Sequence, residues 1–242
     1  MARRFTGKSV LVAGGTGALG RAVTLAFLDE SANVIVTYRR EEEFGALNQA
    51  AAAKTAGDSS LEGHQMDVTD EAAARRLIEG ILARRGRVDV LVNAVGGYAG
   101  GLALWDTDSK VFEQMLALNL RSGFVLCRVI VPVMLKQRSG AIVNVAARAA
   151  VDHPAGAAAY AASKAAAVAM IDSLAADLKG SGVRANTVLP SIFDTDANRR
   201  AMPQADFTKW PKPEDIARVI VFLSSDEARL IHGAAVPVSG VL

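Results

Sequence analysis

The sequence contains one cysteine, few aromatic residues and almost no net charge. Because Cys127 stands alone, an internal disulfide is excluded, and this cysteine usage suits a reducing cytoplasm. A formal net charge of +2 does not indicate a nucleic acid or a membrane as the partner. No apolar run reaches the roughly 18 uninterrupted residues of a membrane span, and the N-terminal run is shorter than the roughly 7–15 residues of a signal peptide. We therefore expect a cytoplasmic protein whose partner is a small molecule.

Alanine and valine are abundant instead, in strand and helix patterns that alternate along the chain. Small side chains of this kind are expected where helices pack on a parallel sheet. The length of 242 residues fits one large domain, so we predict a single α/β domain over residues 1–242. The predicted strands cover 9–13, 33–38, 61–66, 88–93, 141–146 and 234–238, with one more ending before 191. The predicted helices include 42–55, 71–84, 109–137 and 157–178.

Residues 9–28 join a predicted strand to a predicted helix through a glycine-rich turn. Gly15, Gly17 and Gly20 form a G-x-G-x-x-G pattern in this strand–turn–helix context, and Gly14 precedes it. Glycine lets the backbone approach a ligand closely, and the first N–H groups of a helix have no partner within the helix. With the helix dipole, these groups form a site for a pyrophosphate. The alternative is a strand–helix turn that binds nothing.

The end of the second predicted strand lies about 20 residues beyond the glycine turn, where the adenosine ribose of a dinucleotide is held. An acidic residue there would bind the 2′-hydroxyl of NAD, but the residues are Thr37, Tyr38, Arg39 and Arg40. An arginine at this place can bind the 2′-phosphate of NADP. The alternative is that Arg39 and Arg40 are solvated charges, balanced by the acidic run 41–43.

Three polar residues stand out in the apolar helices of the second half. Asn119 lies in the middle of the predicted helix 109–137, where asparagine is a poor helix former and a buried amide needs partners. It is therefore either a structural residue or a site residue.

Tyr160 and Lys164 are one turn apart and project from the same helical face. An ammonium beside a phenol favours the phenolate, so we expect a lowered pKa for Tyr160.

The order and spacing of several motifs resemble the short-chain dehydrogenase/reductase family over nearly the whole chain. They are the glycine turn at 14–20, Asp67-Val68, V-N-A-V-G at 92–96, Asn119, Y-A-A-S-K at 160–164 and K-P-E-D-I-A at 212–217. The resemblance implies a doubly wound Rossmann fold, with about seven parallel strands and helices on both faces. It also implies hydride transfer between a nicotinamide and a small carbonyl or alcohol, or a quinonoid or C=N compound.

The resemblance further implies roles for individual residues. Tyr160 would be the general acid, Lys164 would hold the ribose hydroxyls and tune Tyr160, and Asn119 would position a water for proton relay. The cofactor would be NADP(H) in preference to NAD(H), and no metal is implied. Asp67 is either an adenine contact or a helix cap. The residues that would contact the cofactor are Gly14, Thr16, Gly17, Ala18, Leu19, Gly20, Tyr38, Arg39, Arg40, Asp67, Val68, Asn93, Ala94, Gly96, Tyr160, Lys164, Pro190, Ile192 and Thr195.

The sequence departs from the family pattern at a position near the proton donor. In the family pattern a serine holds the substrate oxygen. Here the stretch 144–147 reads N-V-A-A, so Ala147 occupies the position of that serine. Two departures are milder. Ala18 stands in place of a glycine, and Ser191 follows Pro190 where the family usually has Pro-Gly. Quinonoid dihydropteridine reductases also lack the serine, and G-G-T-G-A-L-G, V-G-G-Y-A-G-G and the segment 189–210 resemble theirs. One alternative function is therefore that reductase; another is a cofactor-binding sensor or scaffold with weak catalysis.

Two longer segments suggest a lid and an interface. The segment 191–212 follows the sixth strand and carries scattered large apolar residues, so it is a candidate lid over the substrate, or else a surface helix and loop. The stretches 112–135 and 157–178 are apolar on most sides, and the sheet can cover only one side. A second copy of the chain would cover the rest, and the family resemblance points to a homotetramer.

Overall fold

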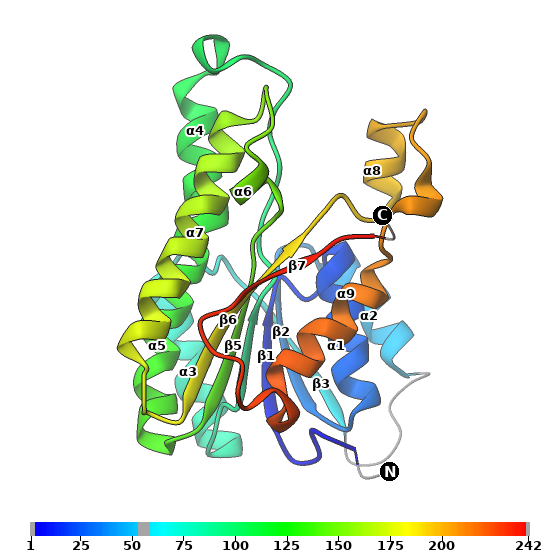
Figure 1. Ribbon diagram of the computed structural model, residues 1–242. Helices are drawn as coiled ribbons and strands as arrows, with labels where there is room; N and C mark the ends of the chain where they lie inside the picture. Colours follow the sequence, from blue (N-terminus) through cyan, green and yellow to red (C-terminus); the bar gives the residue numbers. More distant parts are fainter. Residues whose placement is uncertain (1–2, 53–58, 241–242) are drawn as a thin grey trace.

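Short runs of Val, Ile, Leu and Ala form the inner strands of the protein, and their side chains are almost wholly buried. The computed structural model describes residues 3–52 and 59–240, and within them the strands form one seven-stranded parallel sheet in the order β3-β2-β1-β4-β5-β6-β7 (Figure 1). The strands are β1 (Ser9–Ala13), β2 (Asn33–Tyr38), β3 (Ser60–Gln65), β4 (Val90–Asn93), β5 (Gly140–Val145), β6 (Val183–Pro190) and β7 (Ala235–Val238). The predicted doubly wound α/β fold is confirmed.

Helices cover both faces of the sheet, and each face has its own apolar core. On one face lie α1 (Ala18–Asp29), α2 (Glu41–Ala52) and α9 (Pro213–Ser224). On the other face lie α3 (Glu71–Arg85), α5 (Ser122–Gln137) and α7 (Ala158–Asp177). The strand order reverses between β1 and β4, because β2 and β3 extend the sheet to one side and β5 to β7 to the other. In open α/β sheets the ligand crevice opens at this switch point.

The element boundaries agree closely with the predicted ones. The strands at 9–13 and 33–38 are confirmed to the residue, and α3 begins where Asp70 caps it by accepting hydrogen bonds from Ala72 N and Ala73 N. The predicted helix 42–55 is α2, and its predicted end at 53–55 lies outside the described residues. The stretch after β5 contains a short helix, α6 (Ala149–Asp152), which is not among the helices predicted from the sequence. An ion pair between Arg148 and Asp152, one turn apart, favours this turn of helix.

The predicted helix 109–137 is continuous, but its hydrogen-bond pattern changes in the middle. It consists of α4 (Ser109–Leu116), a π-helical turn η2 (Ala117–Arg121) and α5. Asn119 lies in the π turn, which fits its low helix propensity, and π turns are often found at functional sites. By length and composition the run Ser109–Gln137 would also suit a membrane span, but half of its most apolar window is buried inside the protein. Such burial is typical of a core helix.

Candidate active site

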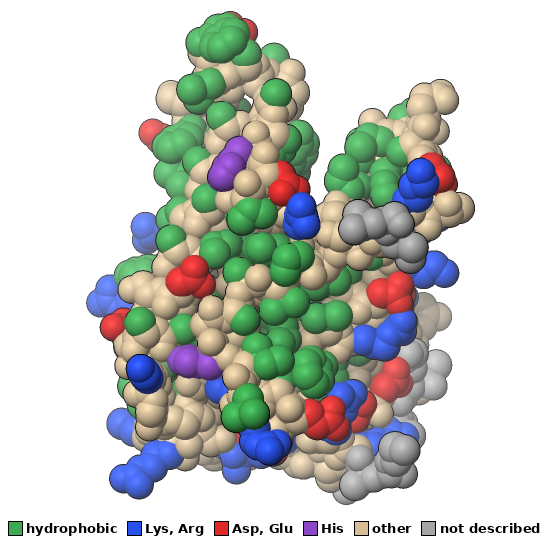
Figure 2. Space-filling view, viewed as in Figure 1, with side chains coloured by type: hydrophobic (Ala, Val, Ile, Leu, Met, Phe, Trp, Pro, Cys, Tyr) green, Lys and Arg blue, Asp and Glu red, His purple; other side chains and the backbone are tan. Residues whose placement is uncertain are grey.

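The carboxyl ends of the strands face a wide notch in the molecular surface. Figure 2 shows the molecule hollowed between a lobe that contains α4, α6 and α7 and a lobe that contains α8 (Asp196–Ala201). The glycine turn after β1, the loop after β4 and the start of α6 all follow the carboxyl ends of adjacent strands and lie beneath the notch. The sequence-predicted site residues are therefore gathered at one edge of the sheet.

The glycine turn has the geometry of a phosphate cradle. Gly14 has a positive φ of 72° and lies against the next loop, where an added Cβ would be 3.2 Å from Val95 N. Gly20 packs so closely on the carbonyl of Gly14 that a Cβ there would overlap it. The N-cap of α1 is Gly17, which offers no side-chain cap, and no acidic residue lies in the first turn. The helix N-terminus is thus free to receive an anion, which fits the pyrophosphate of a dinucleotide.

At the predicted adenosine end, Arg39 is paired across two strands. Its Nη2 lies 2.9 Å from Asp67 Oδ2, and both side chains are more than half exposed. Asp67 Oδ1 also accepts hydrogen bonds from Thr69 N at 2.9 Å and Thr69 Oγ1 at 2.8 Å. Partial burial raises the pKa of Asp67, but the bonds from Thr69 and the charge of Arg39 outweigh it and lower the pKa below its ordinary value. Asp67 is therefore an anion that holds Arg39 at the end of β3.

The neighbouring residues are held by the acids that follow them. Arg40 forms an ion pair with Glu43, whose other carboxylate oxygen accepts a hydrogen bond from Thr16 Oγ1 at 3.0 Å. The hydroxyl of Tyr38 donates to Glu41 Oε2 at 2.6 Å. The acidic run thus balances these charges in part, as the alternative interpretation of the arginines supposed. Arg39 is the arginine whose ion pair reaches outside that run.

Asn119 bridges the two segments that frame the site. Its Oδ1 accepts a hydrogen bond from Gly97 N at 2.9 Å, and its Nδ2 donates to Gly97 O at 3.1 Å. The same Nδ2 lies 3.0 Å from Ser163 Oγ, and the Ser163 hydroxyl donates to Tyr160 O at 2.7 Å. The amide is buried; Nδ2 donates to two oxygens, whereas Oδ1 accepts one hydrogen bond and keeps a second lone pair. The contacts show that Asn119 has a structural part, because they join the loop of Gly97 to α7. Its role as a site residue that positions a water stays a prediction.

Lys164 is a buried cation on the same helix as Tyr160. Its Nζ donates to Val145 O at 3.0 Å, at the carboxyl end of β5. A Cβ added to Gly96 would lie 2.9 Å from both Lys164 Nζ and Asn119 Oδ1, so glycine is needed where the chain passes between these two groups. Burial lowers the pKa of Lys164 to about 8. The ammonium is therefore still the main form at neutral pH.

The pKa of Tyr160 differs from the sequence expectation. Burial, and to a lesser extent the neighbouring Tyr98, raise the pKa of Tyr160 to about 12, whereas the nearby lysine predicted a lowered value. The reason is that desolvation of the phenolate outweighs attraction, because Lys164 donates to Val145 O instead. Tyr160 is consequently a neutral phenol at physiological pH and carries a proton to donate.

Ala147 lies where its sequence position predicts, directly after β5. Ala146 and Ala147 are both buried, and Ala147 O accepts a hydrogen bond from Ala150 N as α6 begins. Arg148 N donates to Pro190 O at 2.9 Å, which ties the end of β5 to the end of β6. The backbone around the missing serine is thus well anchored. What this site lacks is the hydroxyl.

The structure adds two residues that the sequence reasoning did not single out as site residues. Tyr98 packs its ring edge to face on Tyr160, with the centroids 5.0 Å apart and the planes at 76°. Ser163 links Asn119 to the helix that carries Tyr160. The sequence held a signal for each residue. Tyr98 lies between two glycine pairs, and Ser163 belongs to the Y-A-A-S-K motif.

The other predicted cofactor contacts lie at the same edge but in different surroundings. Asn93 Nδ2 donates to Asn144 Oδ1 at 2.9 Å, and Ala94 N donates to Ala13 O at 3.0 Å, so both residues tie strand ends together. Val68 is buried, Ile192 is half exposed, and Thr195 caps α8 by accepting from Asn198 N. Leu19 belongs to the apolar core between the sheet and the helices α1, α2 and α9. Their contacts with a cofactor stay predictions.

The segment 191–212 forms a small unit braced by its own side chains. Arg199 binds Asp194 through two nitrogens, at 2.5 and 2.7 Å, and its guanidinium lies 5.0 Å from the ring centroid of Phe207. Phe207 in turn packs on Trp210 with centroids 5.0 Å apart. Hydrophobic side chains of this lobe face the notch in Figure 2. The position suits a lid, and the lid function stays a prediction.

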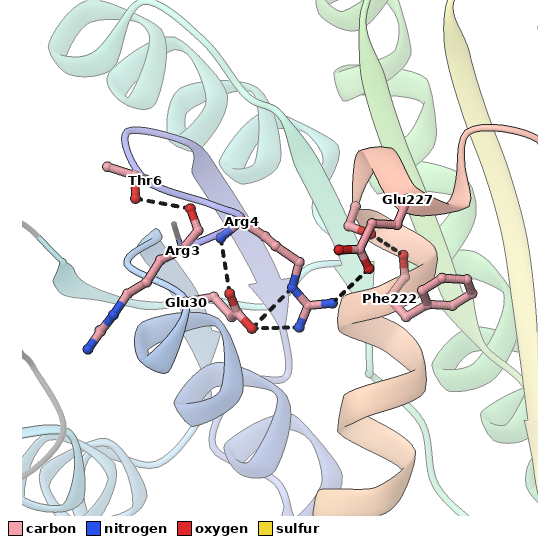
Figure 3. A network of polar contacts seen from close by, with 7 residues as sticks. Arg3, Arg4, Thr6, Glu30, Phe222 and Glu227 are labelled. Carbon is pink, nitrogen blue, oxygen red and sulfur yellow. Dashed lines mark hydrogen bonds and ion pairs between the residues drawn. The ribbon is translucent and has the colours of Figure 1, made fainter. Parts of the chain in front are cut away.

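A cavity of about 410 Å³ lies at the opposite edge of the sheet, around the first residues of β4, β5 and β6. Its basic lining residues are largely engaged by the protein itself. Figure 3 shows Arg4 reaching Glu30 at the end of α1 and Glu227 near the end of α9. Arg184 donates to the carbonyls of Leu223, Ser225 and Ile231. These contacts join elements together, so the candidate active site is the notch at the other edge, near which Asn119, Tyr160 and Lys164 lie.

Comparison with known proteins gives one consistent family. A family model described as short chain dehydrogenase matches residues 8–206. The chain is 35% identical to D-threitol dehydrogenase from Mycolicibacterium smegmatis, over 98% of this chain and 93% of that protein. It is 31% identical to the 3-oxoacyl-(acyl-carrier-protein) reductase FabG from Thermotoga maritima, over 99% of each. Among solved structures, levodione reductase superposes with a TM-score of 0.90 at 27% identity, over 98% of each chain.

Proposed function

We propose that this chain, which belongs to the short-chain dehydrogenase/reductase family and is an NAD(P)-dependent oxidoreductase, works as a reductase. In this reaction Tyr160 donates the proton to a small carbonyl, quinonoid or C=N substrate. The observation that carries this proposal is the bridge made by Asn119, which joins Gly97 to Ser163 beside a neutral Tyr160. A phenol with a pKa of about 12 is protonated at neutral pH and can protonate the more basic alkoxide that hydride addition produces. A general acid works best with a pKa near the operating pH, so this value must fall when the site is loaded.

The mechanism follows from the chemistry of these side chains. When bound, NAD(P)H supplies the hydride, which adds to the substrate carbon. Tyr160 transfers its phenolic proton to the substrate oxygen or nitrogen, so that C=O becomes CH–OH. To stabilise the resulting phenolate, the ammonium of Lys164, which donates to Val145 O in this structure, would turn toward Tyr160 on the same helical face. Asn119 holds the segments that carry Tyr160 and Gly97 in place. A proton from solvent then restores Tyr160.

The test of this function is cofactor oxidation with a panel of carbonyl compounds and a quinonoid dihydropterin. We expect turnover of at least one class, and Tyr160→Phe removes the proton donor. Cofactor binding by this variant is measured separately, because Tyr160 is also among the expected cofactor contacts. Loss of a general acid costs about 10²–10⁴ in rate. Binding of the cofactor without turnover of any compound would favour the sensor or scaffold function instead.

Ala147 offers a way to separate these outcomes. A serine at this position would restore a hydroxyl beside Tyr160, so Ala147→Ser raises activity on simple ketones if the chain is a weakened reductase. If the dihydropterin is turned over well and the substitution brings no gain, the alanine suits the natural substrate. The second result would support the resemblance to quinonoid dihydropteridine reductase.

For the cofactor we propose a preference for NADP(H), carried by Arg39. This guanidinium is well exposed at the end of β2, and a 2′-phosphate can share it with Asp67. Arg39→Ala is expected to weaken NADPH binding relative to NADH about ten- to hundredfold, because a charge-assisted bond of roughly 1.5–3 kcal/mol is lost. Arg75, which pairs with Glu71 on the exposed side of α3, provides the matched control. Tighter NADH binding by the wild type, or an unchanged ratio in Arg39→Ala, contradicts the assignment.

We also propose a cytoplasmic homo-oligomer, most simply a tetramer. The support is the run α4–α5, whose Phe112, Phe124 and Leu135 are each more than two-fifths exposed although the run is strongly apolar. Large apolar side chains grouped on one helix layer favour association with a second copy. Helix α7 packs beside α4 in the same layer and would extend the interface.

A further inference from the structure

Tyr98 is an exposed aromatic residue at a site that otherwise buries its functional side chains. Its side chain is 67% exposed, yet its ring packs edge to face on Tyr160, with the centroids 5.0 Å apart. Within residues 3–52 and 59–240 neither phenol oxygen has a hydrogen-bond partner. A large, flat and accessible ring therefore stands directly beside the proton donor.

The position of this ring is fixed by its backbone. Tyr98 follows Gly97, whose N–H and C=O are both bonded to the amide of Asn119. On the other side, Gly101 N donates to Gly156 O at 2.8 Å, which ties the loop to the segment before α7. A Cβ added to Gly100 would overlap the Tyr98 hydroxyl, so the glycine leaves room for the ring to fold over its own loop. The ring is thus held in place, although nothing covers most of it.

Exposed apolar side chains follow the strand that precedes Tyr98 and the next two strands of the sheet. Leu102 on the same loop, Val151 on α6 and Ile192 after β6 are each about half exposed, and they follow the carboxyl ends of three adjacent strands. The nearby charges of Arg148 and Asp152 are paired with each other. With Ala147 in place of a hydroxyl, few polar groups remain there to bind a hydroxyl-rich substrate. Small-molecule sites are lined mostly by apolar and aromatic side chains, and this surface offers such side chains.

We propose that Tyr98 is a specificity-determining residue whose ring forms the wall against which an aromatic or conjugated cyclic carbonyl packs while Tyr160 protonates it. This inference rests on the proposed function, because it names the substrate class of the same site. Aromatic rings attract one another beyond their buried area, whereas a saturated ring of equal size gains burial alone. The wall therefore discriminates by aromaticity as well as by size.

The test compares two ligands with the same carbon and oxygen skeleton, phenyl methyl ketone with a flat aromatic ring and cyclohexyl methyl ketone with a puckered saturated ring. Their dissociation constants are measured by calorimetry on the full chain with NADP⁺ bound, so that no reduction takes place. We expect the wild type to prefer the phenyl compound and Tyr98→Leu to reduce that preference about 2- to 12-fold. Tyr98→Phe keeps the ring and keeps the preference. Phe222→Leu, at an exposed aromatic residue of α9, is the matched control and changes nothing.

The outcomes separate this inference from the proposed function. Because Tyr98 is largely exposed, Tyr98→Leu is expected to fold, and its circular dichroism and melting temperature check this. An unchanged phenyl-to-cyclohexyl ratio in folded Tyr98→Leu overturns the inference, and so does a wild type that binds neither ketone. If both ketones bind with the expected ratio but no carbonyl is ever reduced, the reductase function fails while the aromatic wall stands.

Discussion

Substitution of Asn119 by alanine tests whether one amide holds the active site together. The change removes hydrogen bonds with Gly97 N, Gly97 O and Ser163 Oγ, at 2.9, 3.1 and 3.0 Å. At about 0.5–1.5 kcal/mol net for each bond, we expect the free energy of unfolding to fall by about 2–4 kcal/mol. For a domain of this size that corresponds to a drop in melting temperature of about 4–16 °C.

The loss of activity is expected to exceed the loss of stability. Without the bridge, the loop that carries Gly97 and the helix that carries Tyr160 are free to move apart, and a displacement of about 1 Å can cost about 10² in rate. The assay measures kcat and KM well below the melting temperature of the variant, so that the folded enzyme alone is compared. We expect kcat to fall about 10²-fold.

Gln137 provides a matched control at the other end of the sheet. Its Oε1 accepts from Val88 N at 3.0 Å, and its Nε2 donates to Val88 O at 2.8 Å, so this amide also binds both groups of one residue. Gln137→Ala should lower the melting temperature similarly and leave kcat nearly unchanged. If Asn119→Ala is as active as the wild type, or Gln137→Ala loses as much activity, the positioning role of Asn119 is refuted.

Two further predictions follow from the buried lysine and from the exposed apolar helices. Because the pKa of Lys164 is about 8, kcat/KM for reduction should fall as the pH rises through that value, and Lys164→Met should abolish this limb. The same lowering from 10.5 means that the folded state gains stability as the pH rises from about 8 to 10.5, a gain that Lys164→Met removes. Light scattering at micromolar concentration should give a mass several times the 25.3 kDa of one chain, and Phe124→Lys should reduce it; a monomer mass for the wild type contradicts the proposed oligomer.

The sequence predicted the layout of the fold well, because strands and helices have distinct apolar periods. The strands at 9–13 and 33–38 are correct to the residue, since both are buried runs between clear turn signals. Asn119 marked the place where the helix pattern changes, because asparagine is disfavoured inside an α-helix. The short helix α6 was missed, because it depends on the local pair of Arg148 and Asp152.

The properties of the site were harder to predict, because they depend on burial and on contacts distant in the sequence. The spacing of Tyr160 and Lys164 correctly placed both on α7, but it could not show that Lys164 binds Val145 O. The pKa of Tyr160 therefore moved in the opposite direction to the expectation. The pairing of Arg39 with Asp67 likewise joins residues on different strands, and a linear pattern does not record it.

The most direct test of the central claim is a single turnover with NADPH that carries deuterium at the transferred position of the nicotinamide. The carbonyl and dihydropterin panel is incubated with an excess of enzyme, and the products are analysed by mass spectrometry. We predict deuterium on the reduced carbon with the wild type and labelling that is about 10²–10⁴-fold slower with Tyr160→Phe, compared at saturating NADPH. Absence of label in every product, or equal labelling by Tyr160→Phe, would contradict a reductase that uses Tyr160 as its proton donor.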